Sequence, residues 1–265
     1  MAAKYEAQAT QRPEAMQPFR QRMAELHRRI EGRHLACARL HRLHALRLQR
    51  WYIGDRAALR PVFMAAVAQH LGVDSAAVTL FGRKGDELLV AASDVTARAA
   101  HDLEQLIGEG PARDVLDGRD FVTAGGTDLA TRWPEYGPAL AQLGVHSVVA
   151  VPLLSSRLLG ALCVFAGVDG LRTEITPATA KVADALANTV LLGAHGTAAD
   201  GAPQGTLFDD ADYLATVHQA VGMVAVQCSC DIDAALALLR ARAFADGIAV
   251  PEIARRVLED GYQLC

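Results

Sequence analysis

Four arginines are the only lysine or arginine residues between Gly205 and the C-terminus: Arg240, Arg242, Arg255 and Arg256. Guanidinium groups bind nucleic acids by neutralising phosphates and releasing the counterions around them. Residues two apart on a helix point about 200° apart, so Arg240 and Arg242 cannot both face one phosphate backbone. Arg242 shares a helical stripe with apolar residues and is placed to lie at the edge of a bundle. Arg240, joined by Arg255 or Arg256, is therefore the predicted phosphate-contact group.

The charge of this segment favours a different interpretation. Seven Asp and two Glu accompany the four arginines, so the segment from Gly205 onward has a net charge of −5. A polyanion is attracted weakly to an acidic unit, because most nucleic-acid affinity comes from cations. The arginines are then solvated charges on helix surfaces. The residue pattern alone favours this second interpretation.

Two further side chains have the chemistry of a small-molecule site. Trp133 lies beside Pro134 in a loop pattern, and aromatic side chains line many ligand pockets. His146 directly precedes an apolar strand pattern. We predict a ligand pocket between a sheet and residues 121–143, with Trp133 and His146 as its candidate residues. The alternatives, which we favour, are that Trp133 fills the edge of the core and that the tip of His146 lies in water.

No motif of a catalytic or metal-dependent class is evident. Gly108–Pro111 is too short for a phosphate-binding loop and lacks the Lys-Ser/Thr that follows such a loop. No nucleophile elbow and no His-Glu-x-x-His helix is present. One residue, not two, stands between Cys228 and Cys230, which favours a structural turn with two buried thiols. We predict no enzymatic activity, no cofactor and no bound metal.

Three short helices are predicted to position the arginines. Apolar residues at helical spacing predict the first helix from Tyr213 to the break at residues 228–230. Asp231 is a good N-cap for the second helix, and Gly247 is suited to end that helix in a left-handed conformation. Pro251 fits the first turn of the third helix.

These helices contain three segments that resemble the ANTAR family of RNA-binding antiterminator domains. The segments are Gln219–Val224, Ala234–Ala243 and Ile253–Ala254. The resemblance implies that residues 207–265 form a three-helix bundle, which binds the paired RNA hairpins of a terminator region and acts as a dimer. Gly222 lies in the first segment and joins Arg240, Arg255 and Arg256 as the predicted RNA-contact residues. The chain departs from the family at two places: Val221 stands where many members have Lys, and residues 248–251 lack the basic residue common in that turn.

Residues 56–193 show a second pattern, in which strands and helices alternate. The order is a helix, two strands, helices, one strand, a helix, two strands and a closing helix. The expected strands are Ala77–Phe81, Glu87–Ala92, Phe121–Thr123, Ser147–Leu154 and Leu158–Ala166. This order predicts an α+β fold, with an antiparallel sheet flanked by helices.

Several segments of this region resemble GAF domains of the actinobacterial sensor type. They are Gly108–Pro111, Arg132–Pro134, Gly144–Ser147, Ala150–Leu153 and Leu159–Leu162. The resemblance implies a sensor fold. Domains of this family hold small molecules, chromophores, haem or nothing, so the resemblance does not specify a ligand.

The first 55 residues are predicted to form a basic helical leader. Residues 1–50 contain eleven Lys or Arg and four Glu, a net charge of +7, and residues 1–12 are predicted to be disordered. Apolar residues recur at alternating steps of three and four, a seam typical of a short coiled coil. The seam consists of Met16, Phe19, Met23, Leu26 and Ile30. It predicts a homodimer, although Gly32 weakens the helix.

The remaining features define the expected organisation. Residues 194–206 are small and polar and predict a linker. Five scattered cysteines argue against a disulfide framework and favour a reducing cytoplasm, and no apolar run approaches the ~20 residues of a membrane span. We predict a cytoplasmic, signal-responsive regulator of transcription antitermination, with RNA and an unidentified small molecule as ligands and no membrane contact. The alternative is a dimeric sensor or protein-interaction scaffold whose acidic output domain does not bind RNA.

Overall fold

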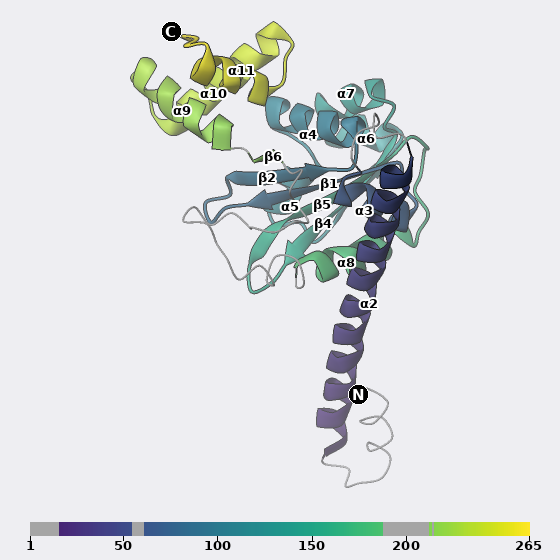
Figure 1. Ribbon diagram of the computed structural model, residues 1–265. Helices are drawn as coiled ribbons and strands as arrows, with labels where there is room; N and C mark the ends of the chain where they lie inside the picture. Colours follow the sequence, from purple (N-terminus) through teal and green to yellow (C-terminus); the bar gives the residue numbers. More distant parts are fainter. Residues whose placement is uncertain (1–15, 55–60, 188–211, 214) are drawn as a thin grey trace.

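The computed structural model describes residues 16–54, 61–187, 212–213 and 215–265 (Figure 1). The predictions of a disordered N-terminus and of a linker at 194–206 fall outside these residues. The elements in chain order are α2 (Gln17–Ile53), α3 (Phe63–Leu71), β1 (Ser75–Phe81), β2 (Glu87–Ala92), α4 (Val95–Ile107), α5 (Pro111–Leu116), β3 (Val122–Gly125), α6 (Thr127–Arg132), α7 (Tyr136–Gln142), β4 (Ser147–Leu154), β5 (Leu158–Ala166), α8 (Ile175–Ala185), β6 (Asp212–Tyr213), α9 (Ala215–Gln227), α10 (Ile232–Asp246) and α11 (Val250–Glu259).

The strands form one antiparallel sheet in the order β3-β4-β5-β1-β2-β6. The predicted α+β class and antiparallel sheet are therefore confirmed. Strand β6, which pairs with the edge strand β2, was not predicted. It has two residues, too few for an alternation pattern to be visible in the sequence.

Helices cover both faces of the sheet (Figure 1). Successive side chains of a strand point to opposite faces, so strands buried on both faces are apolar throughout. In β1, Val78 points toward the core shared with α2, α3 and α8, whereas Ala77 points toward the core shared with α4, α5, α6 and α7. In β4, Val149 and Val148 divide in the same way. This alternation explains the continuous apolar runs in the sequence.

Several helix boundaries differ from the predictions. Helix α3 begins at Phe63, because Val62 is extended and no helix forms at Pro61. For α4 the sequence predicts a helix over Ala97–Ile107; the helix begins two residues earlier, where the carboxylate of Asp94 accepts a hydrogen bond from the backbone N–H of Ala97. The sequence predicts a loop and one helix over residues 130–143. The structure instead has two helices there, α6 and α7, on either side of Trp133.

Helix α2 is one continuous helix of 37 residues, and Gly32 does not interrupt it. Its C-terminal part packs on α3 and α8, with Leu40 buried and Arg33 hydrogen-bonded to both carboxylate oxygens of Asp184 at 2.5 and 2.7 Å. Its N-terminal part extends away from the sheet (Figure 1). There the predicted seam is uncovered: the exposed fractions of Met16, Phe19 and Leu26 are 48%, 53% and 44%.

The last three helices form a bundle with a core of its own. The fully buried side chains include Val224, Leu239, Ile253 and Val257. The predicted helix termini are confirmed: the Asp231 carboxylate accepts from the N–H of Ala234 at 2.7 Å, Gly247 is left-handed with φ 64°, and a proline lies in the first turn of α11. The bundle also packs on the sheet domain, since Val90 of β2 and Leu106 of α4 belong to the same core.

The prediction of two thiols at residues 228–230 was wrong. Cys228 forms a disulfide with Cys265, and their Cα atoms are 5.6 Å apart. Cys230 is free, as are Cys37 and Cys163. The pairing arises because the segment after α11 returns to the end of α9, where the carbonyl of Tyr262 accepts a bond from the side-chain amide of Gln227. Neither that return nor the pairing of cysteines 37 residues apart can be inferred from spacing.

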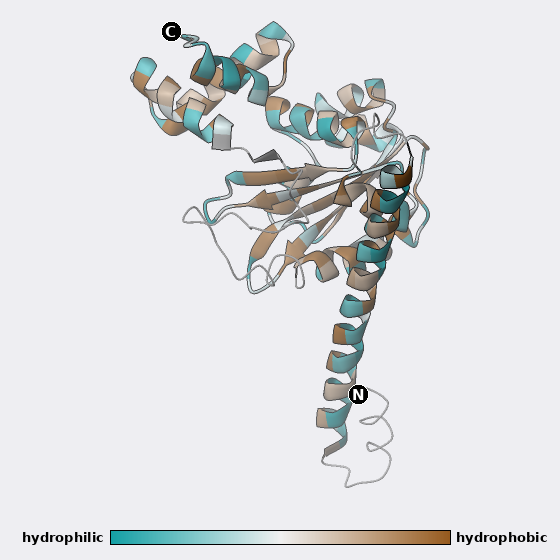
Figure 2. Cartoon of the chain, in the orientation of Figure 1, coloured by the Kyte–Doolittle hydropathy of each residue, from teal (hydrophilic) through white to brown (hydrophobic). Residues whose placement is uncertain are grey.

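Apolar residues are concentrated in the strands and on the inner sides of the helices (Figure 2). Within the part of the chain that the structure describes, no single helix has the length and apolar character required to cross a membrane. The pair Thr216–Gln227 and Ile232–Asp246 reaches that length and composition only when both helices are counted together, across a bend of 106°.

Candidate functional site

A cavity of about 900 Å³ lies between the sheet domain and the C-terminal bundle. The β1–β2 turn, α4 and α5 form one wall, and α9 and α10 form the other. The lining residues are Gly82, Arg83, Lys84, Gly85, Asp86, Glu87, Leu88, Gln105, Arg113, Arg157, Val217, His218, Val221, Ile232, Asp233, Leu236 and Arg240. The bundle contacts the sheet domain along α4. The β1–β2 turn and α10 are not packed together, and the space between them is the cavity.

The lining of this cavity is rich in positive charge. It includes five lysine or arginine side chains and three carboxylates. Arg240 is half-buried, and its Nε has no hydrogen-bond partner among the described residues. Burial lowers the pKa of Arg240, and the nearby Arg113 lowers it further, whereas Glu87 opposes the shift. The two guanidinium groups are therefore close enough to repel each other.

A buried polar group borders the same wall. Nε2 of His101 is 3.4 Å from Oε2 of Glu87, and Nη2 of Arg113 is 3.8 Å from Oε1 of the same carboxylate. Burial lowers the pKa of His101, so the imidazole is neutral at pH 7. Glu87 thus offsets part of the charge of both Arg113 and Arg240. Gln105 is only 3% exposed, and its Oε1 has no partner among the described residues.

Glu104 lies deeper, one helical turn from His101. Its Oε1 accepts a hydrogen bond from the backbone N–H of Arg113 at 2.8 Å. Gly110 makes room for this carboxyl group, because a Cβ at Gly110 would lie 2.5 Å from the Glu104 carboxyl carbon. Burial raises the pKa of Glu104 to about 8, although that hydrogen bond opposes the shift. Gly108–Pro111 is thus a turn that accommodates a buried carboxyl group.

The predicted pocket residues lie elsewhere. Trp133 is 2% exposed and packs edge-on against Tyr136 within the core. Its indole Nε1 is buried without a partner among the described residues. His146 is half-buried, and its backbone pairs with Ala166 and Gly126 at the start of β4. Neither residue lines the cavity of Arg113 and Arg240, so their role as pocket residues stays a prediction.

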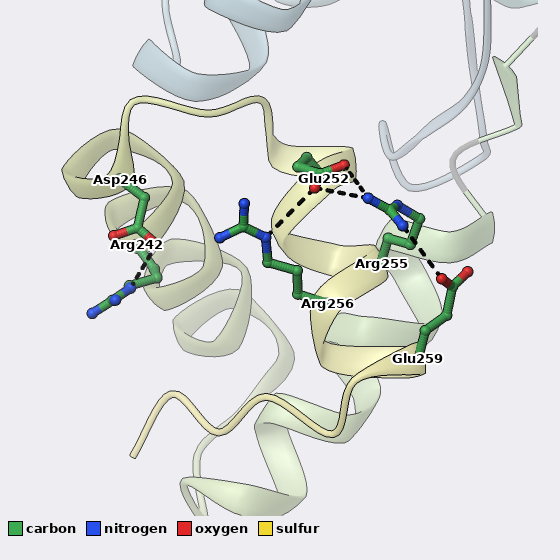
Figure 3. A network of polar contacts seen from close by, with 6 residues as sticks. All are labelled: Arg242, Asp246, Glu252, Arg255, Arg256 and Glu259. Carbon is green, nitrogen blue, oxygen red and sulfur yellow. Dashed lines mark hydrogen bonds and ion pairs between the residues drawn. The ribbon is translucent and has the colours of Figure 1, made fainter.

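The predicted RNA-contact arginines are divided between two surfaces. On α11, Nη2 of Arg255 is 2.7 Å from Glu252 and Nη1 is 3.5 Å from Glu259, while Nε of Arg256 is 3.5 Å from Glu252 (Figure 3). On α10, Arg242 pairs with Asp246 at 3.1 Å and lies over the ring of Tyr262. Arg240 is absent from this network and faces the sheet domain instead. The structure therefore does not bring Arg240 into the ion-pair network of α11.

Comparison with known proteins identifies the sheet domain. The model of the GAF domain family matches residues 55–192, which is more than half of the chain. The chain belongs to the GAF domain family. No curated protein matches it, and the family match does not extend over the C-terminal helices.

Solved structures similar to this GAF protein are distant. The phycocyanobilin-bound GAF domain of a cyanobacterial phytochrome is 18% identical, with a TM-score of 0.40, over 63% of this chain and 98% of that one. The GAF domain of an Acinetobacter phosphoenolpyruvate-protein phosphotransferase is 12% identical, with a TM-score of 0.35, over 62% and 96%. Escherichia coli SdiA is 13% identical, with a TM-score of 0.38, over 74% and 87%.

The polar wall of the cavity was missed by sequence reasoning, although a signal exists. Ala97, Ala100, His101 and Glu104 follow helical spacing on the buried side of α4. Charged and titratable residues at core positions of an amphipathic helix mark either a functional site or a satisfied polar cluster. The contact of Arg113 with Glu87 has no such signal, because it depends on how α5 lies against β2.

Proposed function

We propose that this protein is a signal-responsive regulator in which the GAF domain controls the C-terminal bundle, and that the bundle binds RNA hairpins. The observation that supports this coupling most directly is the shared core, in which Val90 and Leu106 of the GAF domain pack with the bundle. A ligand that binds one arrangement of the two units more tightly than another shifts the population between them. RNA as the target of the bundle is supported by its resemblance to ANTAR domains.

Gly222 supports a close partner contact on α9. A Cβ at this position would meet nothing within 4 Å, so packing within the described residues does not require glycine. Glycine in the middle of a helix costs roughly 1 kcal/mol relative to alanine. Its neighbours Met223 and Val226 are exposed. A flat, side-chain-free position beside exposed residues suits the approach of an RNA backbone.

The ion pairs of α11 can be broken at a small cost in free energy when RNA binds. Arg255 and Arg256 share Glu252 on an exposed helix face, and exposed ion pairs contribute roughly 0–1 kcal/mol each. The arginine side chains can therefore exchange the Glu252 carboxylate for an RNA phosphate with little loss of free energy. Arg255 and Arg256 thus remain available to phosphate groups, which makes them the first residues to test.

The joint variant Arg255→Gln and Arg256→Gln is expected to weaken binding to a two-hairpin RNA and to flatten its salt dependence. The logarithm of the binding constant falls as the logarithm of the salt concentration rises. Each lost phosphate contact makes this decline shallower by roughly 0.7–0.9. The measurement is a salt titration of RNA affinity. Arg242→Gln is the matched control, because Arg242 lies on α10, outside the ion-pair network of α11, and its guanidinium group lies over the ring of Tyr262. Arg240→Gln in the same series tests whether the predicted contact at Arg240 exists.

A second candidate function follows from the same ion pairs. Arg242, Arg255 and Arg256 are each paired with a carboxylate of the bundle, and the segment is acidic overall. These features suit a protein-interaction scaffold that does not bind RNA. Wild-type protein that shows no salt-dependent RNA binding at low ionic strength contradicts the RNA proposal and leaves the scaffold.

We also propose that the protein is a homodimer joined through the exposed part of α2. Replacing Met23 and Leu26 with glutamate is expected to convert the dimer to a monomer, because it places charge in an apolar seam. Light scattering measures the change in mass. The control replaces Gln17 and Gln21 with glutamate, which adds the same charge off the seam. A double seam variant of unchanged mass excludes this seam as the interface.

A further inference from the structure

The cavity between the GAF domain and the bundle has an excess of positive charge along its lining. Arg113 on α5 and Arg240 on α10 lie on opposite walls, and the carboxylate of Glu87 interacts with both. His101 contributes no charge, because burial keeps it neutral. The lining holds five lysine or arginine side chains against three carboxylates, so it has an excess of positive charge, and the partly buried share of that charge is costly without a partner.

Unpartnered hydrogen-bonding atoms belong to three residues of the same lining. Nε of Arg113 and Nε of Arg240 are buried donors without a partner among the described residues. Oε1 of Gln105, a side chain that is 97% buried, is an unpartnered acceptor on the same wall. Buried polar atoms in folded proteins nearly always have partners, so a cluster of this kind indicates a bound group.

The wall formed by α9 and α10 combines apolar side chains with His218, Asp233 and Arg240. Val217 and Val221 of α9 and Ile232 and Leu236 of α10 line it. The volume of about 900 Å³ lies within the usual range for small-molecule sites, which combine apolar walls with a few polar groups. A ligand that binds both the arginines and the apolar side chains of this lining has an anionic group and an apolar body.

We infer that this cavity binds a small organic anion, with its phosphate or carboxylate group between Arg113 and Arg240 and its apolar body against α9 and α10. Guanidinium groups recognise both kinds of anion through paired hydrogen bonds. Gln105 accepts a hydrogen bond from a donor on the ligand. Because Arg113 belongs to the GAF domain and Arg240 to the bundle, the anion links the two units. This inference goes beyond the proposed function and does not depend on RNA binding.

Titration calorimetry of the full chain with phenyl phosphate, at constant ionic strength, tests the inference. Phenyl phosphate has the required anionic group and a small apolar body. Arg240→Gln and Arg113→Gln are each expected to reduce the binding constant roughly tenfold, as expected when a charge-assisted hydrogen bond is lost. Arg242→Gln, on the same helix but outside the cavity, is expected to bind as the wild type does.

Two further probes define the ligand class. Inorganic phosphate is expected to bind more weakly than phenyl phosphate, because it makes no contact with the apolar side chains of the lining. Benzoate has the apolar body with a carboxylate, so its affinity relative to phenyl phosphate shows which anionic group the site prefers. Each probe is also expected to raise the unfolding temperature of the wild type by mass action, and not that of Arg240→Gln.

The outcomes separate binding from folding. Without ligand, Arg240→Gln is expected to unfold at or above the wild-type temperature, because the substitution relieves the repulsion with Arg113. Loss of phenyl phosphate binding in a variant of that stability supports the inference. Equal binding by wild type and Arg240→Gln overturns it, as does the absence of binding of both phenyl phosphate and benzoate at millimolar concentration. A failed RNA titration with intact phenyl phosphate binding contradicts only the proposed RNA function.

Discussion

Replacing Glu104 with glutamine is expected to stabilise the GAF domain at alkaline pH by roughly 3–5 kcal/mol relative to wild type. Burial raises the pKa of this carboxyl group to about 8. Glutamine has nearly the same shape and retains the oxygen that accepts from the N–H of Arg113. The substitution therefore preserves the local structure and removes only the ionisation.

The direction of the pH dependence follows from proton binding. An unfolded glutamate titrates near its ordinary value of 4.5, whereas the folded protein holds the proton up to about pH 8. Below the unfolded pKa, Glu104 is neutral in both the folded and the unfolded chain, and its ionisation takes nothing from the free energy of unfolding. As the pH rises toward 8, the unfolded chain loses the proton first, and stability falls by up to ~1.4 kcal/mol per pH unit. Above the folded pKa the loss is complete.

Urea unfolding between about pH 5 and 9 measures this effect. The wild type is expected to lose stability across this range, and Glu104→Gln is expected to lose much less. Glu174→Gln is the control, because Glu174 is exposed at the start of α8. Parallel pH profiles for wild type and Glu104→Gln contradict the assignment, since other groups would then determine the pH dependence.

The sheet and the bundle could be predicted from sequence because their signals are local. Apolar runs define strands, and Asp231, Gly247 and Pro251 define helix ends through conformations that few other residues adopt as readily. The two halves of Ser147–Ala166 pair as expected because a short turn fixes their register. Strand β6 was missed because it forms only through contact with the edge of β2.

The cavity could not be predicted, because its walls come from distant parts of the chain. The helical spacing of α10 placed Arg240 away from the bundle core, and Arg240 is absent from that core. The sequence therefore predicts that the side of α10 with Arg240 faces solvent or RNA. In the structure this side faces the GAF domain across the cavity. Helical periodicity identifies the residues that avoid a core of their own helices. It does not identify a neighbouring domain that packs on the opposite side.

Reduction of the disulfide between Cys228 and Cys265 is expected to destabilise the C-terminal bundle by about 4 kcal/mol, the chain-entropy value for a loop of this length. The bundle is small, and its three helices share one core with few partners outside it. The disulfide fixes the segment after α11 to the end of α9, which limits the freedom of the unfolded chain. For a unit of this size, such a change lowers the unfolding temperature by on the order of 20 °C.

Thermal unfolding with and without reductant measures the contribution of this bond. The wild type is expected to lose stability on reduction, and Cys265→Ser is expected to unfold at the reduced wild-type temperature in both conditions. Cys230→Ser is the matched control, because Cys230 is two residues from Cys228 and is free. It should retain the full response to reductant. If Cys265→Ser and oxidised wild type unfold at the same temperature, the disulfide does not stabilise the bundle. If Cys230→Ser instead loses the response, Cys230 rather than Cys228 pairs with the C-terminal cysteine.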